Sequence, residues 1–329
     1  MRKILFLAAA LAAGAAHADF IPRVVSGQNV ATVGVNGGSL SYSENWGSGA
    51  LGALIVDAQY TPRRIETGLN TAAANAINGH GATFVKGVVT GTPTLTLRPD
   101  ASGVVFATMS GLSYRVTSTF SGTKWGVINY SCTNTTNYSN ITVTAQYGTA
   151  DGVIPPTKVG INGNLSTSTD CDSNLSWILP VLGDLLINKA EGKVDAGIAN
   201  AVQNGLASVT QKFFFQRDQN WLVGLNRLIP ADKVVYYPGG SFPLGQYIAN
   251  NLPYLIANSQ ITLKLGGGAN LNPVLGTNEP TFDPSGDAIT LTLTSPGVSF
   301  TANLREQVNV YWQWQCSIAN PSRQCQDPR

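Results

Sequence analysis

Residues 112–120 read LSYRVTSTF, and apolar and polar side chains alternate along them. The same alternation recurs in TLTL at residues 94–97 and in ITVTAQY at residues 141–147. A period of two is typical of a strand that buries one face. Turn-forming residues separate the runs at positions 99–103, 121–122 and 134–140. Because no helical stretch intervenes, the sequence predicts an antiparallel meander with one apolar and one polar face.

The period changes after the meander. Residues 173–215 read SNLSWILPVLGDLLINKAEGKVDAGIANAVQNGLASVTQKFFF. Apolar side chains recur there at steps of three and four, at Ile178, Leu182, Leu185, Leu186, Val194, Ile198, Val202, Leu206 and Val209. This spacing predicts a long amphipathic helix, or two collinear helices with a break near Glu191 and Gly192. The apolar stripe of such a helix needs an equally long apolar surface to cover it.

Shorter patterns surround these two segments. Residues 19–60 predict strands and loops, with a short apolar run at 51–56. Thr61 and Pro62 suit an N-cap and a first turn, and they predict a helix that continues to residue 77 before Gly79 and Gly81. Further along, a second helix is predicted at 244–256, and strands at 261–265, 289–294, 298–304 and 308–314.

The N-terminus has the pattern of an export signal. A basic start at Arg2 and Lys3 precedes an apolar run at 4–16, and Ala16 and Ala18 form a small-x-small cleavage site. This predicts a secretory signal peptide at 1–18. With 43% hydrophobic and 12% charged residues in the chain, we expect residues 19–329 to fold as a single elongated domain.

Charge and hydropathy limit the partners of the exported chain. Cleavage removes two of the 20 basic residues and leaves 18 to balance the 18 acidic ones. A neutral bulk surface makes nucleic acid a poor partner. No later stretch reaches the roughly 18 apolar residues of a spanning helix. We therefore expect a periplasmic or secreted protein without a transmembrane segment, and a transient membrane contact stays open.

The four cysteines are Cys132, Cys171, Cys316 and Cys325. An even number in an exported chain favours two disulfides, for which three pairings exist. Nearest-neighbour pairing would join Cys132 to Cys171 and Cys316 to Cys325. The spacings include no C-x-x-C, and His80 would be the one histidine after cleavage. We therefore expect neither a metal site nor a cofactor.

Two local features resemble the tubular lipid-binding (TULIP) superfamily, which includes bactericidal/permeability-increasing-protein-like domains. One is the Trp-containing segment 173–179, which leads into 185–189 and looks like the family's entry to its long helix. The other is Cys132 on the meander with Cys171 just before that helix, which matches the family's strand-to-helix disulfide. The resemblance covers roughly residues 62–215. It implies an α+β fold in which a strongly curved antiparallel sheet is rolled around the long amphipathic helix.

The resemblance also implies a binding site for a lipid or acyl chain between the sheet and the helix. The predicted ligand wall consists of Trp177, Ile178, Leu182, Leu185, Leu186, Ile198 and Val202. The sequence lacks the cationic patch that endotoxin-binding members use, which argues against lipopolysaccharide recognition. If the tube is closed, the same stripe is ordinary core and binds nothing.

Catalysis has little support in the sequence. His80 lies in NGHG at the predicted end of a helix, where a solvated histidine is common, and no G-x-S-x-G motif surrounds a nucleophile. We therefore expect an apolar-ligand carrier rather than an enzyme. The alternatives are an extracellular adhesion or structural β-rich protein, suggested by the many Gly, Ser, Thr and Asn residues, and a secreted hydrolase.

Overall fold

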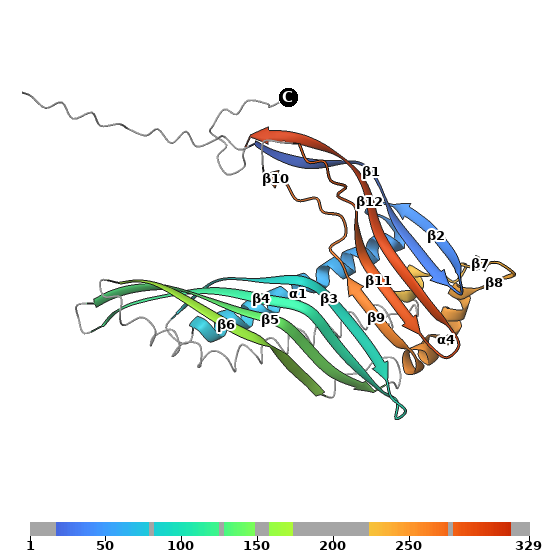
Figure 1. Cartoon of the computed structure of the whole chain (residues 1–329), viewed down its shortest axis with the longest axis horizontal. Helices are drawn as coiled ribbons and strands as arrows, with labels where there is room; N and C mark the ends of the chain where they lie inside the picture. The colour runs from blue at the N-terminus through green and yellow to red at the C-terminus, as the bar shows by residue number, and fades with distance from the viewer. Residues whose placement is uncertain are drawn as a thin grey trace, which may run out of the picture.

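The computed structural model describes residues 18–78, 82–124, 128–148, 158–173, 224–275 and 279–316. Every strand in these ranges belongs to one open antiparallel sheet (Figure 1). The strand order is β6-β5-β4-β3-β9-β11-β12-β1-β2-β7-β8, with β10 paired to β1 beside this path. The expected antiparallel sheet is thus confirmed, whereas the long helix predicted at 173–215 lies outside the described residues.

The part of the chain that the structure describes consists mainly of strands. The strands are β1 (Ala18–Val35), β2 (Gly38–Asn45), β3 (Thr83–Pro99), β4 (Val104–Lys124), β5 (Ile128–Gly148), β6 (Lys158–Ser173), β7 (Val235–Tyr237), β8 (Gly240–Phe242), β9 (Gln260–Leu265), β10 (Val274–Leu275), β11 (Gly286–Thr294) and β12 (Ser299–Cys316). The helices are α1 (Gly49–Asn78), α3 (Leu225–Leu228) and α4 (Leu244–Asn258). None of these helices is long and apolar enough to cross a membrane.

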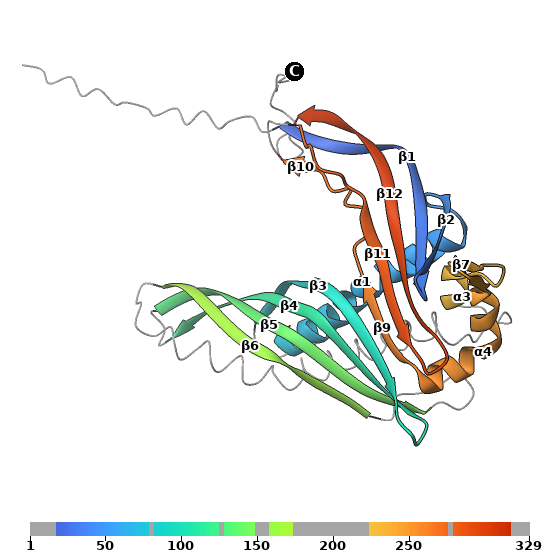
Figure 2. The ribbon, with the colours of Figure 1, turned by 45° about the vertical axis from the view of Figure 1, so that its right-hand side comes forward.

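The sheet has two parts that share a short joint. We call β3, β4, β5 and β6 the first wing, and β9, β11, β12, β1 and β2 the second wing. They meet where β3 pairs with β9, from Thr94 opposite Lys264 to Leu97 opposite Ile261. Figure 2 shows the second wing rising away from the first, while α1 runs across both. The helix therefore bridges a sheet whose two wings are joined by few backbone hydrogen bonds.

Helix α1 confirms part of the predicted helix and corrects its start. Ile65, Leu69 and Ala73 are buried at the predicted helical spacing. However, the helix begins at Gly49, so residues 51–60 are helical and Thr61 is not an N-cap. The same apolar stripe continues upstream through Leu51, Leu54, Ile55 and Ala58, which are also buried. The Thr–Pro signal was misread because a helix can keep Pro62 in its interior when packing compensates for the lost hydrogen bond.

One carboxylate holds the first turn of α1, and a second ties the helix to β12. The Glu44 carboxylate accepts a hydrogen bond from the backbone N–H of Leu51 at 2.7 Å. A negative group is favourable there because the first N–H groups of a helix have no partner within the helix. Nearby, the buried Glu306 carboxylate on β12 accepts hydrogen bonds from Trp46 Nε1 at 2.8 Å, Gln59 Nε2 at 3.2 Å and the N–H of Ala269 at 2.8 Å. Glu306 thereby ties α1 to the second wing.

Bulges fall side by side in three neighbouring strands of the first wing. The register shifts between Gly91 and Thr94 in β3, between Met109 and Leu112 in β4, and between Ser139 and Thr142 in β5. Gly91, Gly111 and Asn140 have φ values of 101°, 84° and 53°. A Cβ on Gly91 would overlap the carbonyl oxygen of Gly111. Because each bulge bends its strand, this row, which we call the crease, bends the wing along a single line.

Two predicted turns are wrong, and the crease lies at the end of one of them. On β4 the buried positions are Val105, Ala107 and Met109 before the bulge, and then Leu112 and Tyr114 after it. The extra residue of the bulge shifts the alternation of buried side chains by one position. The two halves of β4 therefore look in the sequence like two separate short strands. Residues 134–140 and 121–122 were interpreted as turns, but they continue β5 and β4. The predicted turn at 99–103 is confirmed, and Asp100 there accepts the N–H groups of Ser102 and Val104.

Several other predictions also have clear outcomes. Helix α4 matches the predicted helix at 244–256, and β9 and β11 match predicted strands. The two strands predicted at 298–304 and 308–314 are one continuous strand, β12. Strand β6 was not predicted, because it consists largely of asparagine, serine and threonine and contains only three large apolar residues. The single-domain organisation and the signal peptide stay predictions.

Asn140 offers a test of the crease. We expect Asn140→Gly to leave the free energy of unfolding nearly unchanged, because glycine adopts positive φ freely. Asn140→Val should lower it by about 2 kcal/mol, since a β-branched residue is strained there. Urea unfolding of both variants measures the difference. Equal midpoints for the valine variant and the wild type would contradict this role of the crease.

Candidate functional site

The predicted ligand-wall residues Trp177, Ile178, Leu182, Leu185, Leu186, Ile198 and Val202 lie outside the described residues. The structure does place the sheet face that such a wall would meet. We call it the inner face of the first wing, and it is the face on which α1 packs. The apolar face that the sequence predicts for the meander can therefore be located in the structure.

The inner face is apolar from β3 to β5. Leu95 and Leu97 on β3 continue into Val105, Ala107 and Met109 on β4. Past the crease, the buried side chains are Leu112, Tyr114, Val116 and Phe120 on β4, with Cys132, Ile141, Val143 and Ala145 on β5. The predicted faces of 112–120 and 141–145 are thus confirmed. Strand alternation places all of these side chains on one surface.

A hydrogen-bonded group holds α1 on this face, and we call it the helix lock. Tyr114 on β4 donates its hydroxyl proton to Asn70 Oδ1 at 2.8 Å. Asn70 in turn donates from Nδ2 to the Gly87 carbonyl at 3.1 Å. Glu66, one turn earlier, accepts the N–H of Val89 at 2.8 Å. Burial, reinforced by the negative charge of Glu66, raises the pKa of Tyr114, so the tyrosine stays neutral and remains a donor.

Helix α1 packs chiefly on β3 and touches β4. Its buried Leu69 and Ala73 lie beside the helix lock in sequence. Val143 and Ala145 lie two strands away from β3, on β5, yet they are about as buried as Leu95. The apolar surface is therefore wider than the part of it that α1 chiefly contacts.

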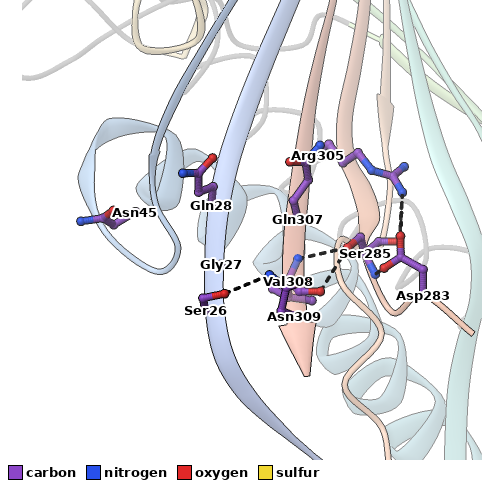
Figure 3. A pocket seen from close by; sticks show the side chains of 10 residues that line it. All are labelled: Ser26, Gly27, Gln28, Asn45, Asp283, Ser285, Arg305, Gln307, Val308 and Asn309. Atoms are coloured by element: carbon purple, nitrogen blue, oxygen red, sulfur yellow. Dashed lines mark hydrogen bonds and ion pairs between the residues drawn. The ribbon is translucent and has the colours of Figure 1, made fainter. Parts of the chain in front are cut away.

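A polar pocket of about 620 Å³ lies on the second wing (Figure 3). Asn45, Gln28 and Gln307 form one cross-strand row over β2, β1 and β12. Beside them, Asn309 Nδ2 donates to Ser26 Oγ at 2.9 Å, and Val308 N–H donates to Ser285 Oγ at 3.0 Å. This lining offers amide and hydroxyl groups suited to a polar ligand.

Arg305 closes one end of the polar pocket. Its guanidinium lies 3.1 Å from Asp287 Oδ1 and 3.9 Å from Asp283 Oδ2. Hydrogen bonds from the backbone and side chain of Ser285, with Arg305 adding less, lower the pKa of Asp283. A carboxylate held in its ionised form in this way is a poor proton donor at neutral pH.

A second pocket, of about 680 Å³, lies on the first wing and is lined by β3, β4 and β5. Lys86 and Arg115 contribute the charged groups of its lining, in which no carboxylate takes part. Arg115 stands opposite Val88 in the β3–β4 register, and Lys86 lies two residues from Val88. Sequence analysis missed both pockets because each is assembled from strands far apart in the chain, and no local motif marks them.

The cysteine positions can be followed in part. Cys132 is disulfide-bonded, and the β5–β6 register puts Cys171 directly opposite it. Opposed positions on antiparallel strands are spaced within the usual Cα range of a disulfide. Cys316 ends β12 opposite Ala18 on β1. Cys325 and His80 lie outside the described residues, and within those residues no group of three or more His, Cys, Asp or Glu is placed to hold a metal ion.

Comparisons with known proteins give a loose likeness of fold. No protein-family model matches the chain, and no curated protein does. Among solved structures, a crystal structure of lipopolysaccharide binding protein aligns with 86% of this chain at 9% identity and a TM-score of 0.28. The alignment spans 50% of the length of that protein.

Gly87 tests the helix lock. A Cβ at this position would overlap Asn70 Oδ1 and the Tyr114 hydroxyl, so Gly87→Ala must displace the Asn70 side chain. We expect the free energy of unfolding to fall by about 2–3 kcal/mol as buried polar groups lose their partners. Gly267→Ala is the matched control, because nothing lies within 4 Å of its added Cβ. Thermal melts that show the two alanine variants to be equally stable would refute the lock.

Proposed function

We propose that the chain is an exported, non-catalytic protein that binds a lipid or another apolar ligand against the inner face of the first wing. The observation that carries this proposal is the continuous apolar surface from Leu95 on β3 to Ala145 on β5. This surface is wider than the part that α1 chiefly contacts, and the crease bends the strands that form it. A bent apolar surface can enclose an acyl chain more fully than a flat one.

The driving force would be the transfer of apolar surface out of water. Each buried methylene contributes about 0.8 kcal/mol, so a 16-carbon chain gains on the order of 10 kcal/mol before ordering costs. The inner face suits this because its polar groups are few and partnered. The Tyr114 hydroxyl, for example, is engaged by Asn70. A fatty-acid-like ligand would therefore meet little competing polarity.

The predicted helical stripe at 177–202 supplies the other half of the proposed site. Its apolar residues recur every three or four positions, and they need an apolar surface several strands wide. The inner face is such a surface. A signal peptide cleaved after Ala18 would direct this chain to the periplasm or outside the cell, where it could carry lipid.

An extracellular adhesion or structural role is the second candidate. The two pockets favour it, because their linings are rich in amides and hydroxyls and suit polar ligands. The two candidate functions predict different molecules bound to the protein after purification. A carrier should retain lipid through purification, whereas an adhesion protein should bind a surface and retain none. Mass spectrometry of organic extracts from the natively purified protein separates the two.

Val143 provides the mutational test of the ligand face. Val143→Thr keeps the volume but adds a hydroxyl on β5, away from the main α1 contact. If lipid lies there, we expect about tenfold weaker binding of a fluorescent fatty acid, because the new hydroxyl loses water without gaining a partner. The melting temperature should also fall, because Val143 is buried, so the affinity for the probe is the quantity that tests the ligand face.

Val33→Thr is the matched control in the second wing. Val33 is fully buried on β1, so the same isosteric change should lower the melting temperature and leave fatty-acid affinity unchanged. The proposal fails if the wild type neither carries lipid nor binds the probe after delipidation. It also fails if Val143→Thr and Val33→Thr bind the fatty-acid probe equally well.

We also propose that Cys171 is the disulfide partner of Cys132 and that Cys316 pairs with Cys325. The first bond would close a loop of about 40 residues and stabilise the fold by roughly 4 kcal/mol on the chain-entropy model. Peptide mapping without reduction should recover these two linked pairs. Recovery of Cys171 linked to Cys316 or Cys325 would contradict the pairing.

A further inference from the structure

The outer edge of β6 is long and unpaired among the described residues. β6 is 16 residues long and is the last strand of the first wing. Among the described residues, no strand pairs with its outer edge. Residues 159–169 contain no charged side chain and no proline, which are the usual means of blocking an edge. An edge of this kind is a template for adding another strand.

β6 is also regular enough to accept a partner. Where its register with β5 shifts, β5 advances three residues from Ser139 to Thr142, while β6 moves two, from Asn164 to Asn162. The extra residue of the bulge thus belongs to β5. Because the bulge lies on the inner neighbour, β6 can present an uninterrupted row of backbone donors and acceptors.

An apolar side chain stands near the middle of this edge strand. Leu165 is 42% exposed. It lies opposite Tyr138 of β5, whose side chain is partly buried against the core. Ile161, four residues earlier in β6, is on the same face of the strand. Exposed leucine at the rim of an apolar surface gains free energy when a further strand covers it.

We propose that β6 pairs antiparallel with β6 of a second copy of this chain, about a two-fold axis through Leu165. In this register Leu165 faces its own counterpart, Ile161 faces Thr169, and Lys158 faces Asp172. When one residue of the first copy faces a second residue of the other copy, the same two residues also meet with the copies exchanged, as an isologous two-fold interface requires. The two sheets become one, and the inner faces of both first wings become continuous.

Charge favours this orientation over a parallel one. Lys158 opens the strand, and Asp170 and Asp172 stand near its end. Antiparallel pairing brings the basic start of one strand to the acidic end of the other at both ends of the interface. Parallel pairing in register would instead put like charges side by side, which destabilises a sheet.

The assembly stops at two copies. The other end of the strand path is β8, which has three residues, Gly240–Phe242. So short an edge offers few hydrogen bonds for a further chain. Pairing through β6 uses the same edge of both copies, so the two-fold interface is closed on itself and does not propagate into a fibre.

The oligomeric state of the mature, oxidised protein tests the proposal. Light scattering coupled to size exclusion should give twice the chain mass for the wild type. Leu165→Lys should weaken the dimer by about a hundredfold, because two ammonium groups would meet on the axis. The matched control is Phe106→Lys, which changes a residue that is 43% exposed on the inner strand β4 and should leave the dimer intact. Thermal melts establish that both variants are folded.

Crosslinking tests the register. Leu165→Cys should form an intermolecular disulfide without added crosslinker, because the two cysteines would face each other. Thr167→Cys should not, since residue 167 would face Gly163 of the other copy. Gels run with and without reductant report the result for both variants.

Three outcomes would overturn the proposal. The wild type could remain monomeric from about 1 to 100 µM, which would mean that this edge is covered by the chain itself or is left free. Leu165→Lys could remain as dimeric as Phe106→Lys. Thr167→Cys could crosslink as readily as Leu165→Cys, which would exclude a two-fold axis at residue 165. None of these outcomes bears on lipid binding, which is measured separately.

Discussion

The crease is the constraint on which the rest of the first wing depends. A Cβ on Gly91 would overlap the Gly111 carbonyl oxygen, and a Cβ on Gly111 would overlap that of Thr92, while the positive φ values of both residues suit glycine. Asn140 continues the same line on β5, where asparagine tolerates the left-handed region. A bulge on one strand would bend that strand alone, but three adjacent bulges bend all of them together. The curvature of the inner face is therefore a property of three small-residue positions rather than of its apolar side chains.

Helix α1 makes a bent sheet with a short joint into one structure. The β3–β9 ladder is short, so backbone pairing alone would hold the two wings loosely. The helix begins on the second wing, where Glu44 holds its first turn and Glu306 holds Gln59. It continues to the first wing, where Asn70 links Tyr114 to the Gly87 carbonyl. Two polar anchors at opposite parts of one helix thus fix the relative position of two apolar surfaces.

The sequence reveals local periodicity well and long-range placement poorly. The alternation in 112–120 and 141–145 predicted which side chains are buried, because strand alternation needs only neighbouring residues. The start of α1 was missed because Pro62 suggests a first turn, whereas the true start depends on Glu44 and a turn at Gly49. The strand through residues 134–140 was missed because asparagine-rich sequence resembles a turn until a partner strand, β6, satisfies its backbone. The helix lock and both pockets join residues from distant segments, so no window of sequence contains them.

The polar sequence of β6 and the apolar alternation at residues 141–145 of β5 have one physical origin. On β5, positions such as Val143 face the inner surface and are buried, so their alternation is strict. β6 lies one strand further out, where residues 164–168 are exposed and Gly160, Ile161 and Gly163 are partly buried. Selection for burial weakens there, yet the backbone still needs a partner on one side. The strand is accordingly built from small polar residues that pair readily. That composition leaves its outer edge unblocked, and Leu165 is the position at which apolar character returns.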